Sequence, residues 1–77
     1  IYKIRILFEE EAEKELYDFL ATTGVTVRKT YFVNKLREGN KELKESYLYL
    51  SLPKGMTVNE LLEKLSSYHE IYEVSEA

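Results

Sequence analysis

The stretch "KESYLYLSLP", from Lys44 to Pro53, alternates tyrosine and leucine in its middle. Successive side chains of a β-strand point to opposite faces of the sheet, so a strict alternation separates the two residue types. One face carries the leucines and the other the tyrosines: Leu48, Leu50 and Leu52 against Tyr47 and Tyr49. The stretch therefore predicts a strand that buries its leucines in a core and turns its tyrosines away from that core.

The first eight residues, "IYKIRILF", show the same period of two and predict a second strand of this kind. One face carries Tyr2, Ile4, Ile6 and Phe8, and the other carries Lys3, Arg5 and Leu7. The β-branched and aromatic segments 25–33, "VTVRKTYFV", and 71–74, "IYEV", predict two more strands. Segment 25–33 has two possible core faces, Val25, Val27, Tyr31 and Val33 or Arg28, Thr30 and Phe32. We expect the valine set inside, with a bulge because Lys29 interrupts it.

Two helices are predicted between these strands. In residues 9–24, apolar positions recur on one helical face, and Gly24 provides a stop signal. Thr57 and Glu60 have the spacing of a capping box at the start of a second helix. The apolar stripe of this second helix consists of Val58, Leu61, Leu62, Leu65 and Tyr68. The polar segment 34–45 separates two strands, with Gly39-Asn40 as its turn signal.

The resulting order, βαββαβ, predicts an α+β, ferredoxin-like sandwich formed by one domain of residues 1–77. Right-handed crossovers give a four-stranded antiparallel sheet in the order 4-1-3-2, with two helices on one face. The uncovered face is the candidate interaction surface, with Tyr47, Tyr49, Lys3, Arg5 and Leu7 on it. Tyrosine is enriched at protein interfaces, which favours an association role for this face.

Composition excludes several classes of protein. The chain has no cysteine, so disulfides and thiolate metal sites are not available. Its net charge of −3 argues against a strongly basic nucleic-acid binder. We find no apolar run of membrane-spanning length and no signal peptide. The chain starts and stops at the limits of its own predicted elements, so we expect a domain excised from a larger protein.

The sequence offers no convincing constellation for chemistry. We find no nucleophile elbow, no phosphate-binding glycine loop and no paired carboxylates. His69 is the only histidine, which makes it a poor nucleus for a metal site. The glutamates Glu9, Glu10, Glu11 and Glu13 diverge from consecutive helical positions, whereas Mg²⁺ needs converging oxygens. We therefore predict no catalytic residue, no cofactor and no metal site.

RNA-recognition domains share this element order and stack bases on aromatic residues of their central strands. The alternation in "KESYLYLSL" imitates that pattern, and Lys3 and Arg5 offer charges for phosphate. However, the glycine-containing start of the motif is missing, and the first strand offers no aromatic residue on the open face. We therefore expect a protein contact there and no nucleic acid.

The βαββαβ order, the size and the acidic balance resemble ACT-like regulatory domains. In that family small ligands bind near the turn between the first strand and the first helix. The corresponding stretch here, "FEEEAEKEL", lacks the glycine that lets a backbone approach a ligand closely. Tight amino-acid binding is therefore not expected. A small-molecule-sensing ACT domain of a soluble enzyme or regulator remains the alternative, so a ligand stays an open question.

A narrower resemblance is to the cytoplasmic C-terminal domain of MgtC/SapB-family membrane proteins, which has an ACT-like fold without that glycine. It rests on the opening "YKIRILF" and the closing "LLEKLSSYHEIYEV", and it spans essentially the whole chain. The resemblance carries over no catalytic residue. It implies a regulatory or association domain on the cytoplasmic face of a bacterial inner membrane, itself not embedded, in a parent protein linked to magnesium homeostasis. The implied partners are a second copy or the parent's membrane domain.

Overall fold

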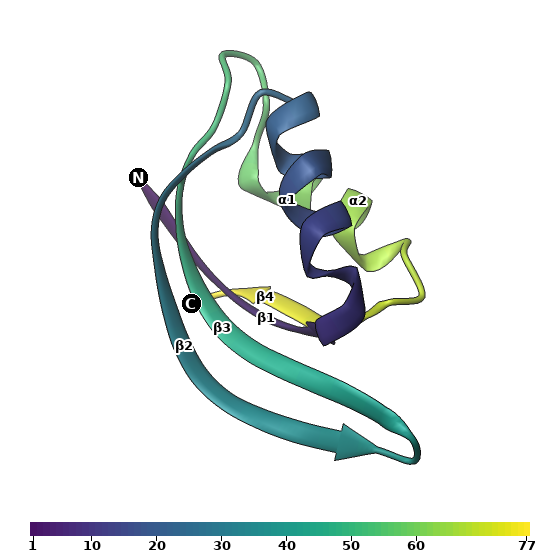
Figure 1. The fold of residues 1–77 in the computed structure, drawn as a ribbon. Helices are drawn as coiled ribbons and strands as arrows, with labels where there is room; N and C mark the ends of the chain where they lie inside the picture. Colours follow the sequence, from purple (N-terminus) through teal and green to yellow (C-terminus); the bar gives the residue numbers. More distant parts are fainter.

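The computed structural model describes residues 1–77, which form one sheet and one layer of helices. The elements are β1 (Tyr2–Glu9), the short 3-10 turn η1 (Glu10–Ala12), α1 (Glu13–Thr22), β2 (Thr26–Glu38), β3 (Lys41–Ser51), α2 (Val58–Ser66) and β4 (Ile71–Glu76). The strands lie in the order β2-β3-β1-β4, and every neighbouring pair is antiparallel. Both helices cover the same face of the sheet (Figure 1). The predicted α+β fold and its strand order are confirmed.

The core lies between the sheet and the two helices, where both apolar stripes meet the leucine face of β3. Ten buried residues form it: Ile4, Ile6, Phe8, Leu16, Leu20, Val25, Leu48, Leu50, Leu61 and Leu65. Tyr2 was predicted on this face but is 40% exposed, since it lies at the start of β1 at the margin of the core. Neither helix is long and apolar enough to span a membrane.

β2 contains two bulges, and the first of them changes which side chains face the core. Val27 pairs with Leu50 and Lys29 pairs with Tyr49, so Arg28 is an extra residue without a partner. Each bulge reverses the alternation that follows it, because side chains alternate with a period of two. Val25 and Val27 therefore face the core as predicted, but the prediction that Tyr31 does so was wrong.

The hairpin between β2 and β3 is longer than the sequence indicated. The polar segment 34–45 continues both strands up to a two-residue turn of Gly39 and Asn40. Gly39 has φ +61° at the first central position, where a two-residue hairpin turn of type II′ requires glycine. Every residue of β2 after Val27 is exposed, so the β2 strand of this hairpin arm has no buried face. On the β3 strand of the arm, Leu43 is buried. Figure 1 shows the arm projecting beyond the helices.

The predicted capping box at the start of α2 is confirmed. The backbone N–H of Glu60 donates to Thr57 Oγ1 at 3.1 Å, and the backbone N–H of Thr57 donates to Glu60 Oε1 at 3.0 Å. These bonds satisfy two backbone donors that the first helical turn otherwise leaves unpaired. The backbone N–H of Thr57 also lowers the pKa of Glu60, because it stabilises the carboxylate.

We expect Thr57→Ala to lower the free energy of unfolding by about 1 kcal/mol, because it removes the cap. Urea denaturation measures this. Asn59→Ala, at an exposed position of the same helix, is the control and should change stability by less than about 0.5 kcal/mol. The pKa of Glu60 is lowered by folding, so its contribution is present above the ordinary glutamate pKa and is lost as pH falls through the lowered value. An effect of Thr57→Ala that grew in acid would contradict this account.

Candidate association surface on the open sheet face

The structure brings the five predicted surface residues together on the face that no helix covers (Figure 1). Along β1 and β3, Lys3 lies opposite Tyr49, Arg5 opposite Tyr47, and Leu7 opposite Glu45. These three pairs form consecutive rows on the same face, because paired residues of an antiparallel sheet project to the same side. Leu7 is only 7% exposed and offers almost no accessible area. The other four are partly exposed and define the accessible part of the face.

Lys3 lies over two aromatic rings. Its Nζ is 4.4 Å from the centre of the Tyr47 ring and 5.6 Å from the centre of the Tyr49 ring. A lysine ammonium at these distances from a ring face is attracted by the ring quadrupole. Lys3 takes part in none of the ion pairs of the structure. The face therefore presents a cation that is held over two rings and has no carboxylate of its own.

Arg5, in contrast, is already paired with carboxylates from both neighbouring strands. Its Nε donates to Glu45 Oε2 at 2.6 Å, and its Nη1 donates to Glu73 Oε1 at 2.9 Å. The hydrogen bond to Glu73, followed by the one to Glu45, raises the pKa of Arg5. The guanidinium thus connects β3, β1 and β4 across the face. We interpret Arg5 as a residue that holds the three strands' side chains in place, and its own positive charge is already compensated by Glu45 and Glu73.

Strand β2 adds two residues that sequence reasoning did not place here, Lys29 and Tyr31. Lys29 pairs with Tyr49 and Tyr31 with Tyr47, while Arg28 Nε donates to Ser51 Oγ at 2.9 Å. The rings of Tyr31 and Tyr49 meet edge to face, with their centres 6.1 Å apart, and Lys29 Nζ lies 4.6 Å from the centre of the Tyr31 ring. The only sequence signal was the interruption at Lys29. We call the set Tyr31, Tyr47, Tyr49, Lys3, Lys29 and Arg5 the tyrosine face.

Charge on the tyrosine face is arranged in a gradient along the strands. The row of Lys29, Tyr49 and Lys3 is cationic. Two rows further on, Glu45 and Glu73 flank Leu7 with carboxylates. The aromatic and guanidinium groups of the middle row lie between these two ends. Because Glu45 and Glu73 share the single guanidinium of Arg5, that end keeps an excess of negative charge, opposite to the cationic row. Opposite charges at the two ends suit a self-complementary contact.

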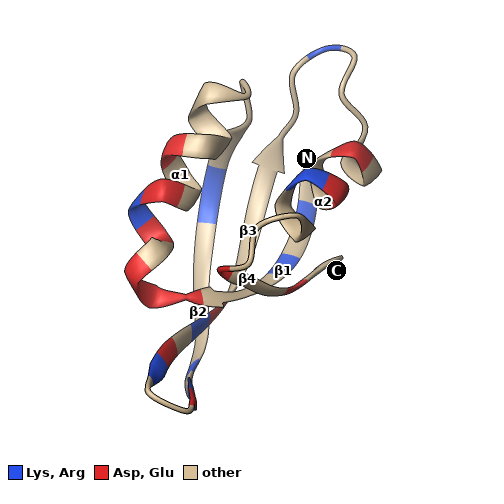
Figure 2. Ribbon diagram, turned by 90° about the vertical axis from the view of Figure 1, so that its right-hand side faces the viewer, with Lys and Arg blue, Asp and Glu red and all other residues tan.

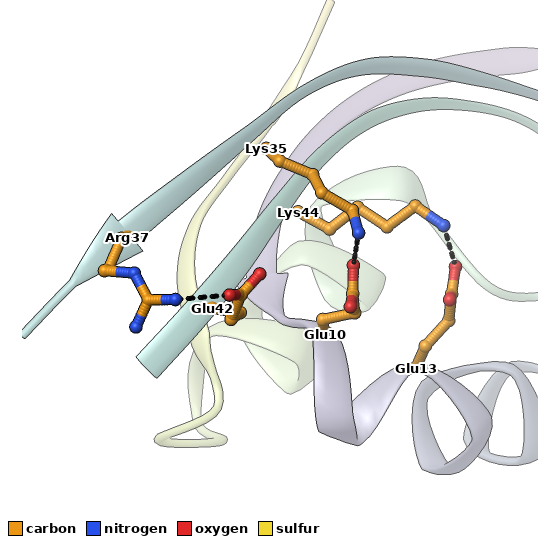
Figure 3. Close-up of polar contacts among 6 residues, drawn as sticks. All are labelled: Glu10, Glu13, Lys35, Arg37, Glu42 and Lys44. Carbon is orange, nitrogen blue, oxygen red and sulfur yellow. Dashed lines mark hydrogen bonds and ion pairs between the residues drawn. The ribbon is translucent and has the colours of Figure 1, made fainter. Parts of the chain in front are cut away.

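Two of the glutamates considered above as a possible magnesium site, Glu10 and Glu13, form ion pairs with lysines. Lys44 Nζ lies 2.8 Å from Glu13 Oε2, and Lys35 Nζ lies 2.9 Å from Glu10 Oε2 (Figure 3). Both lysines come from the β2–β3 arm, and the hydrogen bond to Glu10 raises the pKa of Lys35. Figure 2 shows the acidic residues along α1 and basic residues on the nearby arm. These ion pairs join the arm to η1 and to the first turn of α1.

The remaining candidates for chemistry do not converge. No group of three or more histidine or carboxylate side chains is placed to hold a metal ion. The side chain of His69 is largely exposed, and its Nδ1 lies 3.4 Å from Glu70 Oε1. In the arm, Arg37 forms an ion pair with Glu42 (Figure 3). We therefore take the tyrosine face as the candidate functional site.

No protein-family model matches the chain, and no curated protein matches its sequence. Among solved structures, it is similar to the C-terminal domain of the MgtC protein from Mycobacterium tuberculosis. The two share one fold. The TM-score is 0.56 at 18% sequence identity, over 99% of this chain and 83% of that chain. The resemblance predicted from the first strand and the last helix is thus confirmed for the fold.

Proposed function

We propose that this chain is a non-catalytic association domain that pairs with a second copy through the tyrosine face. The observation that supports this most directly is the ammonium of Lys3 held over Tyr47 and Tyr49 on an uncovered sheet face. Exposed aromatic groups with a polar end are frequent at protein interfaces. The likeness in fold to the MgtC C-terminal domain supports a parent protein in a bacterial inner membrane, linked to magnesium homeostasis, with this domain on the cytoplasmic side.

A two-fold axis that runs across the strands through the row of Arg5, Tyr47 and Tyr31 gives the pairing its geometry. This operation places Lys3 of one copy over Leu7 of the other, between Glu45 and Glu73. The cationic row of each copy then meets the acidic row of its partner. The tyrosines of the middle row meet at the axis. Such an interface is isologous, so each favourable contact occurs twice.

The size of the face indicates that the pairing is weak. Four strands about 4.8 Å apart and three rows of side chains cover roughly 400 Å² per copy. A standard stable interface buries about 800 Å² per partner. The sheet also curves around the helices, so the open face is convex and contact is confined to its centre (Figure 1). We therefore propose a dimer that forms when copies are held at high local concentration, as neighbouring parent chains would hold them.

We expect the double variant Tyr47→Ser/Tyr49→Ser to remove self-association while the domain stays folded. The substitution deletes both rings and with them the aromatic faces over which the Lys3 ammonium lies. Leu48 and Leu50 still fill the core. Sedimentation velocity over a concentration series measures the association, and circular dichroism checks the fold. Tyr2→Ser is the matched control, because Tyr2 is exposed on the same sheet but is paired with Leu50 on the opposite face.

A charge exchange tests the orientation of the two copies. Lys3→Glu should weaken the dimer, since it brings a third carboxylate against Glu45 and Glu73. Adding Glu73→Lys in the same chain should restore part of the affinity.

Self-association that persists in the double tyrosine variant would rule out this surface. Salt-sensitive binding of single-stranded RNA that the same variant loses would favour a nucleic-acid platform instead.

A further inference from the structure

A second surface lies on the helical side of the molecule, away from the tyrosine face. It is a groove of about 490 Å³ that runs between α1 and the segment from the end of α2 to the start of β4. Leu16 and Leu65 are buried at its floor, and Phe19 and Tyr68 contribute aromatic walls. The rest of the uncharged lining consists of Ala12, Thr22 and Ile71. The charged residues of the lining are Glu15, Asp18 and Glu70.

The groove is elongated and open. Its lining extends from Ala12, at the end of η1, along α1 to Thr22, which corresponds to about 15 Å at the rise of an α-helix. The rings of Phe19 and Tyr68, which both line the groove, meet edge to face with centres 5.2 Å apart. Tyr68 is 44% exposed, so apolar surface along the groove is open to solvent. This length equals about three turns of a second helix laid alongside α1.

The charged lining of the groove is entirely acidic. Asp18 is paired with Lys14 at 2.7 Å, but Glu15 takes part in no ion pair. The only ionic neighbour of Glu70 is His69, at 3.4 Å, and a histidine is charged only when it is protonated. No lysine or arginine lines the groove. Glu15 therefore has no ion-pair partner beside the apolar floor, and Glu70 has one only when His69 is protonated.

We propose that this groove binds an amphipathic helix that carries leucine-like side chains on one face and lysine or arginine along its margins. The apolar residues of the ligand would occupy the floor formed by Leu16 and Leu65, and its cations would meet Glu15 and Glu70. A groove whose lining follows three turns of α1 suits a helix laid alongside that helix. The site is separate from the tyrosine face, so either proposal can fail without the other.

The probe is a synthetic amidated peptide of about 14 residues, roughly four turns, with leucine at positions i, i+3, i+4 and i+7 and lysine on both flanks. Two further peptides serve as comparisons. One has the same composition in an order that removes the apolar face, and the other has glutamate in place of lysine. Titration followed by amide NMR should show the first peptide binding, with shifts concentrated at Ala12, Leu16, Phe19 and Leu65. Neither comparison peptide should bind measurably.

Glu15→Gln/Glu70→Gln should weaken binding of the first peptide about three- to tenfold, since each exposed ion pair contributes modestly. The matched control is Glu11→Gln/Glu63→Gln, which removes the same charge from exposed helical positions outside the groove and should change the affinity less than twofold. The proposal is overturned if the reordered peptide binds equally well, if the two double variants lose affinity equally, or if the shifts lie outside the groove. The absence of any binding by the first peptide would also overturn it.

Discussion

Leu48→Ala is expected to lower the free energy of unfolding by about 2–5 kcal/mol, the range for a large buried aliphatic side chain cut back to alanine. Leu48 is 0% exposed and lies in the core between the sheet and both helices. A domain of this size has a stability of only about 5–15 kcal/mol in total. The loss therefore corresponds to a fall in Tm of roughly 8–40 °C.

Thermal and urea unfolding of the wild type and the variant measure this loss. Leu52→Ala is the matched control, because Leu52 belongs to the same alternating stretch but is only partly buried at the margin of the core. Its cost should be clearly smaller. Tyr47→Ser and Tyr49→Ser, on either side of Leu48, should each cost less than Leu48→Ala. Equal losses at all these positions would mean that the stretch does not separate a core face from an open face.

The alternation predicted the two central strands correctly because neither is interrupted where they pair. In the pairing of β1 with β3, residues from Tyr2 to Glu9 match residues from Leu50 to Leu43 without a shift. The core face of each strand could therefore be assigned from the alternation, through Ile4, Ile6 and Phe8 on β1 and Leu48 and Leu50 on β3. That assignment also placed Lys3 and Arg5 beside the tyrosines, so most of the candidate site followed from the same pattern.

β2 could not be predicted in the same way. Its two bulges each reverse the alternation, and the sequence does not show which residue is the extra one. Tyr31 was therefore assigned to the core although it completes the tyrosine face. The arm beyond it is mostly polar, and its one pair of leucines, Leu36 and Leu43, is too little to show a strand alternation in the sequence.

The ion pairs at the start of α1 depend on long-range contacts. Lys44 and Glu13 are separated by 31 positions and meet only because the long arm reaches the first helical turn (Figure 3). The helical spacing in the sequence could show that the glutamates at the start of α1 diverge from one another. It could not show which cations approach them, because that depends on the length and curvature of the hairpin. Predicting this part of the surface requires the register of β2 against β3.

Ser46 is an exception to the apolar pattern of the core face. It pairs with Ile6 on β1 and with Phe32 on β2, and it is 0% exposed. Its Oγ has no hydrogen-bond partner in the structure. A buried hydroxyl without a partner costs about 1–3 kcal/mol, because it loses its bonds to water and gains none. Alanine removes the hydroxyl and leaves the rest of the side chain in place.

We therefore expect Ser46→Ala to raise the free energy of unfolding by about 1 kcal/mol, which corresponds to an increase in Tm of roughly 4–8 °C. Ser51→Ala is the control on the same strand, because Ser51 Oγ accepts a hydrogen bond from Arg28 and its removal should cost a little stability. Ser46 lies on the helical side of the sheet, so self-association through the tyrosine face should not change. A loss of stability in Ser46→Ala would show that the hydroxyl finds a partner in solution. The surroundings of Ser46 would then be more polar than its complete burial implies.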